Sequence, residues 1–212
     1  MEQLFTDVTF DRRDFREVTL PKGEYENCMF THCELSGVDL MGILFVECVF
    51  SDCNLSMANL KATVFRDVQF KDCKMLGLHF EDCDAFGRQF SFEGCTLNHV
   101  SFYQVKLKKM VFRKGTLHEA DFSGCDLTSA VFDGCDLRDA KFENTILVKA
   151  DLRTAFNYSI DPTINGVKKA RFALPAVIGL LDRFDILICP HSSLVYQGRI
   201  PRIAQGFPRF CP

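Results

Sequence analysis

The sequence predicts an all-β fold, a parallel β-helix whose coils have four sides. The first observation is a period of five, because an apolar residue stands at every position divisible by five from Phe5 to Phe80. The second is a longer period of twenty, equal to four pentapeptides. A period of five matches neither an α-helix, at 3.6 residues, nor a strand, at two. It matches a chain that turns a corner every five residues and points two of each five inward.

The stretch Glu119–Phe142 shows the five-residue pattern most clearly. Its large apolar positions are Phe122, Leu127, Phe132, Leu137 and Phe142. Two places before each of these stands a small residue, and these are Ala120, Cys125, Ala130, Cys135 and Ala140. Both sets are predicted to fill the inside of the coil. Coils of this kind stack about 4.8 Å apart, and each is stabilised by its neighbours.

The repeat shifts in phase by two residues between Phe80 and Phe92. The second run then extends from Phe92 to Leu152 and alternates Phe with Leu as far as Leu147. The extra residues must lie within Glu81–Ser91, and Gly87 suits an outward bulge there. At the other end, Gln3 and Arg13 occupy the small inward position, where burial of a polar side chain is costly. The first coil is therefore expected to be incomplete.

Residues 1–160 are predicted to form the β-helix, and residues 161–188 a C-terminal helix and strand. Within Ala173–Phe184 the apolar residues recur at helical spacing, and Pro175 stands near the start. The apolar run Phe184–Ile188 reads as a strand. The helix either caps the open end of the solenoid or forms a two-fold interface, two roles that are compatible. The candidate cap or dimer residues are Leu174, Val177, Ile178, Leu181 and Phe184.

The last residues, 189–212, contain three Arg, no acidic residue and no repeat, and they are predicted to be a disordered or adventitious tail. The whole chain has a net charge of −3. Residues 1–152 hold 25 acidic and 17 basic residues, whereas residues 153–212 hold 3 and 8. An acidic repeat body disfavours direct nucleic-acid binding. The first twenty residues contain no apolar run that would suggest a secretory signal, and no stretch is long enough to span a bilayer. We therefore expect a cytoplasmic protein with no membrane contact.

Eleven cysteines invite a search for a metal or disulfide site. Nine of them occupy the small inward position of the repeat: Cys28, Cys33, Cys48, Cys53, Cys73, Cys83, Cys95, Cys125 and Cys135. Counting by twenty and allowing for the phase shift, Cys33, Cys53, Cys73 and Cys95 form one column. Parallel inward side chains do not converge tetrahedrally on zinc, and a cytosolic chain keeps its thiols reduced. We therefore interpret these cysteines as small buried apolar residues, with no metal and no cofactor.

No arrangement of residues indicates catalysis. The five histidines have no carboxylate and nucleophile at a spacing typical of a triad, and we interpret them as structural surface residues: His32, His79, His99, His118 and His191. No glycine-rich phosphate loop follows a strand. A solenoid filled by its own side chains also offers no obvious cavity. The chain is predicted not to be an enzyme, with no catalytic or cofactor-binding residues.

The surface feature of most interest is a stripe of acidic residues. Glu47 and Asp67 are twenty residues apart, as are Asp52 and Asp72, so each pair should stack on one face. Like charges on adjacent strands cost stability, which favours a functional stripe offered to a basic partner. The alternative is that Asp favours corners, where it hydrogen-bonds the turning backbone, with Arg66 and Lys71 neutralising the stripe. A separate basic patch is predicted on two adjacent sides, from Lys106, Lys108, Lys109, Arg113 and Lys114.

The motif of Ala or Cys, one residue, then Leu or Phe, repeated every five residues, resembles the pentapeptide-repeat family. That resemblance implies a right-handed, quadrilateral β-helix. With the apolar helix and the ending Phe184–Ile188, the chain is similar to the Qnr-like quinolone-resistance group. The group implies an acidic, rod-shaped dimer that mimics duplex DNA and occupies the DNA-binding saddle of type II topoisomerases, above all DNA gyrase. Members protect the enzyme from fluoroquinolones or inhibit it. Some of them carry long projecting loops, whereas this chain has only the two-residue shift near Gly87.

On that resemblance, the expected function is to bind DNA gyrase and modulate its activity or its fluoroquinolone sensitivity. The acidic stripe would compete electrostatically with DNA, and the C-terminal segment would set the rod length by forming a homodimer. The alternative is a non-enzymatic scaffold or regulatory rod with another protein partner, since the repeat is specific for the fold and weak for function.

Overall fold

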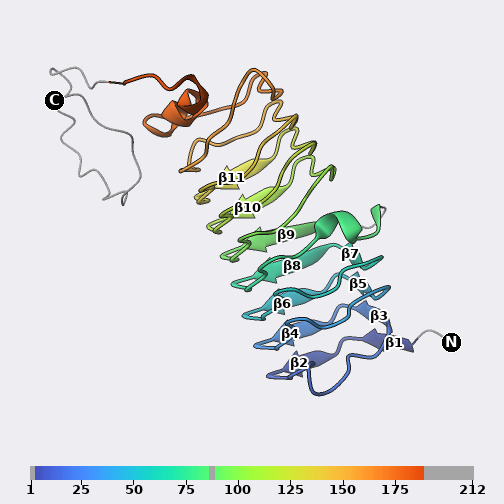
Figure 1. Cartoon of the computed structure of the whole chain (residues 1–212). Helices are drawn as coiled ribbons and strands as arrows, with labels where there is room; N and C mark the ends of the chain where they lie inside the picture. Colours follow the sequence, from blue (N-terminus) through green and yellow to red (C-terminus); the bar gives the residue numbers. More distant parts are fainter. Residues whose placement is uncertain (1–2, 86–88, 189–212) are drawn as a thin grey trace.

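The computed structural model describes residues 3–85 and 89–188 and confirms the all-β parallel solenoid (Figure 1). Every ladder between its strands is parallel. The strands are β1 (Gln3–Thr6), β2 (Thr9–Asp11), β3 (Gly23–Glu26), β4 (Met29–Thr31), β5 (Leu44–Val46), β6 (Val49–Ser51), β7 (Val64–Arg66), β8 (Val68–Lys71), β9 (Phe90–Glu93), β10 (Val111–Arg113) and β11 (Val131–Asp133).

The strands form two sheets, each of which covers one side of the rod. One sheet has the order β1-β3-β5-β7, and the other has the order β11-β10-β9-β8-β6-β4-β2. Within a sheet, paired residues are one coil apart, as for Phe30 and Phe50. The remaining sides are held by single parallel bridges, such as Asp14 with Glu34 and Asp39 with Asn59. The period of twenty is therefore one turn around four sides.

The chain turns between sides through residues with left-handed backbone angles. Asp7, Glu47 and Lys109, for example, have φ values of 58°, 53° and 60°. Their backbone N–H groups stay hydrogen-bonded, because each donates to a carbonyl in the next coil, as Glu47 N does to Arg66 O at 2.8 Å. This conformation is costly for most residues, but Asn and Asp tolerate it better than others. It explains why polar residues recur two places after each large apolar residue.

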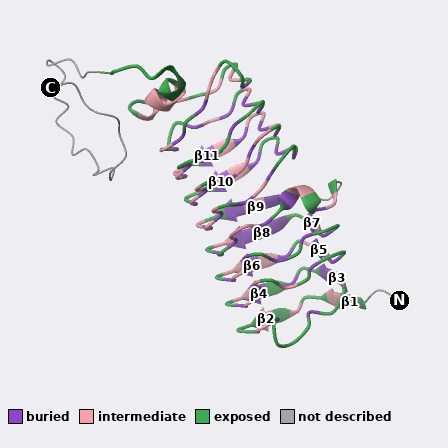
Figure 2. Cartoon of the chain, in the orientation of Figure 1, coloured by how far each residue is buried: buried purple, intermediate pink, exposed green. Residues whose placement is uncertain are grey.

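Buried residues recur on successive coils along the rod (Figure 2). Many of them are aromatic, and their rings stack in columns inside the rod. One column runs almost the whole length, and its rings stack closely, as Phe30 does on Phe50, with centroids 4.5 Å apart. A second column changes side at the phase shift. On the first side it consists of Phe5, Tyr25, Phe45 and Phe65, and on the next side of Phe80, just before the shift, and then Phe102, Phe122 and Phe142. Most coils therefore bury two large aromatic and two large aliphatic side chains. The volume that fills each coil therefore stays nearly constant.

The phase shift is confirmed by the register of the sheets, because Phe70 pairs with Phe92, 22 residues away. The extra residues enter between Asp84, whose N–H still donates to Thr63 O in the ordinary register, and Gln89, whose carbonyl accepts from Val68 N. Phe90 is buried here and packs against Phe65 and Phe80, with ring centroids 6.2 Å and 5.1 Å away. The bulge predicted at Gly87 lies outside the described residues.

The nine cysteines at the small inward position are all buried free thiols. Their Sγ atoms mostly donate to a backbone carbonyl of the coil before, as Cys53 Sγ does to Phe30 O at 3.3 Å. Burial raises the pKa of Cys48 and of Cys125 to about 12, so these two stay as thiols at neutral pH. Within residues 3–85 and 89–188, no group of three His, Cys, Asp or Glu residues is placed to hold a metal ion. The cysteines act as small core residues.

The coil continues past the boundary predicted at residue 160. Single parallel bridges still join Ile146 to Gly166 and Asp151 to Arg171. The five-residue pattern missed this last coil because Asn157 and Pro162 stand where large apolar residues are expected. Tyr158 is buried instead, one position later. Val167 and Phe172 then pack against the core.

The C-terminal segment differs from the predicted α-helix and strand. It contains two short 3-10 helices, η3 (Ala176–Leu180) and η4 (Asp182–Phe184). A 3-10 helix has three residues per turn, whereas the predicted α-helix has 3.6. Ala176 and Leu180 pack against the core, whereas Leu174 is 84% exposed. The strand predicted at Phe184–Ile188 is wrong, since Asp185 adopts a left-handed conformation and residues 186–188 pair with no strand. The tail predicted at 189–212 lies outside the described residues.

A single glycine fixes how η3 sits on the last coil. The Gly179 carbonyl accepts a hydrogen bond from Ile160 N at 2.9 Å, and a Cβ at Gly179 would overlap the carbonyl oxygen of Tyr158. We expect Gly179→Ala to lower the free energy of unfolding by about 1–3 kcal/mol, the usual cost of overpacking. Thermal unfolding measures this. Gly166→Ala is the matched control, because a Cβ there meets only ordinary contacts. Equal stability of the two variants would contradict this docking.

None of the helices described is long and apolar enough to cross a membrane. A third short helix, η1 (Phe80–Asp82), lies just before the phase shift.

Candidate functional site

The four predicted acidic residues lie at two neighbouring corners of the rod. Glu47 and Asp67 turn the chain from β5 to β6 and from β7 to β8, and Asp52 and Asp72 follow β6 and β8. All four have left-handed φ values, between 51° and 54°, and all four are exposed. Because these positions form the borders of one sheet, the carboxylates project from its two edges. We call these four residues the acidic edge.

The backbone stacks the acidic edge in pairs. Glu47 N donates to Arg66 O at 2.8 Å, and Asp52 N donates to Lys71 O at 3.0 Å. These bonds place Glu47 directly beside Asp67 in the next coil, and Asp52 beside Asp72. The predicted stacking along one face is therefore what the structure has.

Most of the acidic edge is not neutralised. Among the residues described, no ion pair involves Glu47, Asp67 or Asp72. Asp52 lies near a histidine, with Oδ2 4.0 Å from His32 Nε2. Arg66 and Lys71, which were expected as possible neutralising partners, also form no ion pair in the described part of the chain. Stacked like charges without partners cost stability, so packing within the chain does not account for them.

The corner conformation explains only part of the acidic edge. Asp tolerates left-handed angles better than most residues, so local geometry accounts for Asp52, Asp67 and Asp72. It does not account for Glu47, whose longer side chain has no such preference. It also does not account for the lysines at equivalent corners after the phase shift, such as Lys109 and Lys114, with φ values of 60° and 51°.

The charge of the rod changes at the phase shift. Residues 3–85 hold 15 acidic and 8 basic residues, whereas residues 89–188 hold 12 and 13. The predicted basic patch lies just beyond the shift, and all of its members are exposed: Lys106, Lys108, Lys109, Arg113 and Lys114. Lys108 is paired with Asp126 at 3.2 Å. The sequence prediction contrasted an acidic body with a basic tail and did not divide the body at the phase shift.

The described histidines each lie beside a carboxylate. The shortest of these contacts joins His118 Nε2 to Asp136 Oδ2 at 2.9 Å, and the others involve His32, His79 and His99. His191 lies outside the described residues. These pairs are spread over different coils and do not converge on one site.

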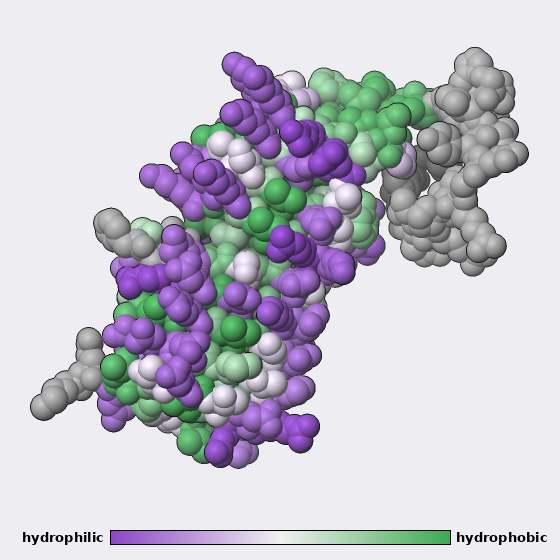
Figure 3. Space-filling view, turned by 180° about the vertical axis from the view of Figure 1, so that it is seen from behind, coloured by the Kyte–Doolittle hydropathy of each residue, from purple (hydrophilic) through white to green (hydrophobic). Residues whose placement is uncertain are grey.

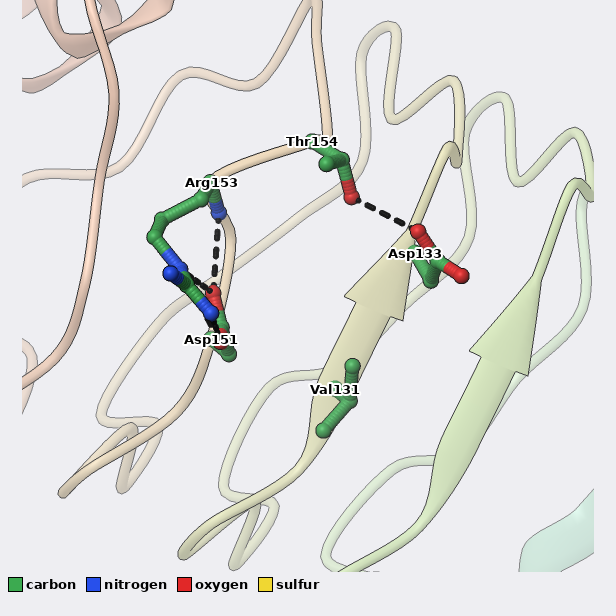
Figure 4. Close-up of a pocket in the computed structure, with 5 residues that line it drawn as sticks. All are labelled: Val131, Asp133, Asp151, Arg153 and Thr154. Atoms are coloured by element: carbon green, nitrogen blue, oxygen red, sulfur yellow. Dashed lines mark hydrogen bonds and ion pairs between the residues drawn. The ribbon is translucent and has the colours of Figure 1, made fainter.

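A hollow of about 360 Å³ lies on the last coils, beside β11 (Figure 4). Its polar groups already bond to one another. Thr154 Oγ1 donates to Asp133 Oδ1 at 3.0 Å, and Arg153 Nε donates to Asp151 Oδ1 at 2.9 Å. The remaining lining residue is Val131. Because the groups satisfy each other within the chain, we interpret this hollow as structural.

The pair of Asp151 and Arg153 gives a pH-dependent prediction. The hydrogen bonds from Arg153 hold the pKa of Asp151 below its ordinary value of 3.8. A lowered pKa stabilises the fold above the ordinary value, and this contribution is lost as the pH falls through the folded-state pKa. We expect Asp151→Asn to lower stability at pH 7 by less than about 1 kcal/mol, as for other exposed pairs. At a pH below the folded-state pKa of Asp151, the variant and the parent should unfold alike. A difference that persists at low pH would contradict this.

Comparison with known proteins gives a family and a fold. The family described as the pentapeptide repeat region matches residues 23–102 and 88–152. No curated protein sequence matches the chain.

Among solved structures, a trypsin-treated form of QnrB1, described as a plasmid-mediated fluoroquinolone resistance protein, aligns with a TM-score of 0.57 and 18% identity. The alignment covers 88% of this chain and 98% of that one. Full-length QnrB1 gives a TM-score of 0.43 at 20% identity, covering 87% and 100%. HetL from the cyanobacterium Nostoc, described as involved in heterocyst differentiation regulation, gives 0.40 at 18% identity, covering 80% and 85%. The alignment with trypsin-treated QnrB1 shows that the two chains share a fold.

Proposed function

Because the chain belongs to the pentapeptide-repeat family, we propose that it is a non-enzymatic binding rod that mimics duplex DNA and binds a type II topoisomerase, DNA gyrase above all. The observation behind this proposal is the acidic edge, four exposed and stacked carboxylates of which three have no ion-pair partner in the described chain. A partner that matches them must present basic side chains on a surface shaped for a rod. The DNA-binding saddle of a type II topoisomerase is such a surface.

The charge spacing supports the comparison with DNA. The acidic edge supplies two carboxylates per coil, and coils about 4.8 Å apart give one charge per roughly 2.4 Å of rod. Duplex DNA has one charge per about 1.7 Å of its axis. The two densities are similar, so a surface that binds phosphates can also bind this edge. Such binding is expected to weaken with salt, because exposed charges are screened.

The effect on the enzyme follows from this competition. A rod that occupies the DNA site lowers the amount of DNA bound, which inhibits the enzyme or removes the cleaved complexes that fluoroquinolones stabilise. The shared fold with QnrB1, described as a fluoroquinolone resistance protein, supports the second effect as part of the proposal. The site of action would be the cytoplasm, where the enzyme acts on DNA.

We also propose that the C-terminal segment, residues 161–188, joins two chains end to end. Its apolar side chains are exposed in this single chain, with Leu174 at 84%, Phe184 at 49% and Leu187 at 70%. Figure 3 shows the hydrophobic surface gathered at this end of the rod. Burial of such side chains against a second copy would stabilise a two-fold dimer and lengthen the acidic surface.

A DNA supercoiling assay tests the proposal. Purified chain is added to DNA gyrase with and without ciprofloxacin, and supercoiling and cleaved DNA are both measured. Inhibition without the drug, or recovery of supercoiling in its presence, supports topoisomerase binding. No effect of either kind at micromolar concentrations would rule it out and favour the alternative, a scaffold or regulatory rod with another protein partner.

A further inference from the structure

The corners that border one sheet reverse their charge at the phase shift. This sheet, β2 to β11, lies between two corner columns. At the first corner, Asp7, Asn27, Glu47 and Asp67 precede the shift, and Lys109, Ser129, Lys149 and Lys169 follow it in successive coils. At the second corner, the charge reverses only next to the shift, where Asp52 and Asp72 precede Gly94 and Lys114 follows it. Arg12 and His32 occupy this corner in the first coils, and Gly134 follows Lys114. All of these residues have left-handed backbone angles, so the same local geometry presents opposite charges in the two halves.

The charged members of these columns have few partners within the chain. In the described ranges, Lys109, Lys114, Lys149 and Lys169 form no ion pair, as is true of Glu47, Asp67 and Asp72. All are exposed. Next to the shift, the corners of this face therefore present carboxylates on one side and ammonium groups on the other, while the sheet between the corners also holds Lys71, Glu93 and Asp133.

We propose that this face binds a second copy of the chain in the antiparallel direction. The two-fold axis lies in the interface at β9. It pairs each coil before the shift with the coil that lies equally far beyond the shift in the second copy. It places Asp67 opposite Lys109 of the second copy and Asp72 opposite Lys114. At the far end it places Asp7 opposite Lys169. Each of these pairs forms twice, because a two-fold interface is self-complementary.

The residues at the axis are suited to meeting their own copies. Gln89 and Ser91 are neutral, and each is able to hydrogen-bond to the same residue of the second copy. Gly94 has no side chain. Glu93 would face itself, but it lies between Lys71 and Arg113 in the same sheet, with which it is in register. In the pair, Lys71 of one copy would face Arg113 of the other. Glu93 lies between these two positive charges.

The shape of the face also permits close approach near the axis. A hollow of about 410 Å³ lies there, lined from both sides of the phase shift by residues that include Asp67, Gln69, Ser91, Lys109 and Arg113. It leaves room for side chains from a second rod. Two coils from the axis, half-buried Val49 would meet Val131 of the second copy, which adds apolar contact.

Charge selects the direction of pairing. Single exposed ion pairs stabilise by about 1 kcal/mol or less, so the complex is expected to be weak and sensitive to salt. A parallel pair in register would place the first corner of one copy on the second corner of the other, with Asp67 opposite Asp72 and Lys109 opposite Lys114, which repels. The antiparallel arrangement is therefore favoured by attraction in one direction and repulsion in the other.

Self-pairing would cover the acidic edge. If that edge binds a topoisomerase, as proposed above, the second copy competes with the enzyme, and only the unpaired rod is active as a mimic. This consequence rests on the proposed function. The pairing itself does not, since it follows from the charges of the chain alone.

Charge-swap variants of the full chain test the pairing by sedimentation equilibrium at about 50 mM salt, where screening is weak. One variant has Asp67→Lys and Asp72→Lys, a second has Lys109→Asp and Lys114→Asp, and a third has all four changes. Corner positions accept both residue types, so all three are expected to fold, which circular dichroism checks. We expect each two-site variant to weaken self-association at least about tenfold, and the four-site variant to recover to within about threefold of the parent, because it restores opposite charges across the pair.

Three results would overturn the pairing. The parent chain could fail to self-associate at low salt, or the two-site variants could associate as tightly as the parent, which would locate the contact at the C-terminal segment. The four-site variant could also fail to recover. Zero-length cross-linking of mixed light and heavy isotope-labelled chains adds a direct readout. A link from Asp67 of one chain to Lys109 of the other supports the antiparallel pair, and links found only within single chains contradict it.

Discussion

Replacement of Phe112 by alanine is expected to lower the free energy of unfolding by about 3–5 kcal/mol, the range for loss of a buried aromatic side chain. Phe112 is 1% exposed. Its ring stacks between Phe92 and Phe132, with centroids 5.6 Å and 4.9 Å away. Removal leaves a cavity in the middle of the longest aromatic column. Because each coil is stabilised only by its neighbours, the loss affects the contacts on both sides.

Urea unfolding followed by circular dichroism measures this effect, and two further variants serve as comparisons. Phe156→Ala removes the same side chain from an outward position that is 41% exposed, and it should cost less than about 1 kcal/mol. Phe112→Leu keeps most of the volume and should cost less than the alanine variant. If Phe112→Ala and Phe156→Ala proved equally stable, the inward and outward assignment of the repeat would be wrong.

Charge reversal of the acidic edge is expected to abolish the effect of the protein on DNA gyrase. In the variant with Glu47, Asp52, Asp67 and Asp72 all changed to Lys, four attractive contacts with a basic surface become repulsive. Even about 1 kcal/mol for each contact sums to a loss in affinity of several hundredfold or more. The supercoiling assay described above measures this as a rise in the concentration of protein needed for half of its effect.

The control variant must change the net charge equally without touching this edge. Glu17, Glu119, Asp139 and Glu143 are exposed and lie elsewhere on the rod, outside the C-terminal segment, and changing them to Lys supplies that match. This control should keep the effect to within about threefold, since only distant and screened charges change. If both variants lost activity alike, total charge rather than the acidic edge would govern binding. If neither did, the edge would have no role in it.

The repeat allowed most of the fold to be predicted, because a single rule of burial applies to every coil. Phe30, Phe50 and Phe112 each point inward for the same reason, so one spacing places them all. The prediction of buried residues was less complete where the large inward side chain does not stand at the five-residue spacing. Tyr158, one position out of phase, and Phe90, inside the phase shift, fill the core in ways that counting by five does not reveal.

The C-terminal segment was predicted less well, because its structure depends on what it packs against. The apolar residues of Ala173–Phe184 fit an α-helix on spacing alone. The open end of the last coil instead holds η3 through Gly179 and Leu180, whose contacts favour the tighter 3-10 turn. Residues 186–188 have strand-like composition but form no strand within the described part of the chain.

The acidic edge was predicted correctly as a stacked set of residues, since Glu47 and Asp67 are one coil apart. The matching basic columns were not, because Lys109 and Lys149 come into line with Asp67 only when the two-residue shift is included. Corners that hold Asp and corners that hold Lys adopt the same left-handed backbone angles. The sequence pattern that specifies the coil therefore says nothing of the charge on its corners.

Displacement of DNA from the enzyme tests the central claim most directly. Fluorescently labelled duplex DNA is bound to purified DNA gyrase, the chain is added, and fluorescence anisotropy reports how much DNA remains bound. We expect the anisotropy to fall to the value of free DNA, with a midpoint that rises in proportion to the DNA concentration, as competition for one site requires. A chain that leaves the DNA bound at saturating concentration, or that displaces it equally well after reversal of the acidic edge, would contradict the account.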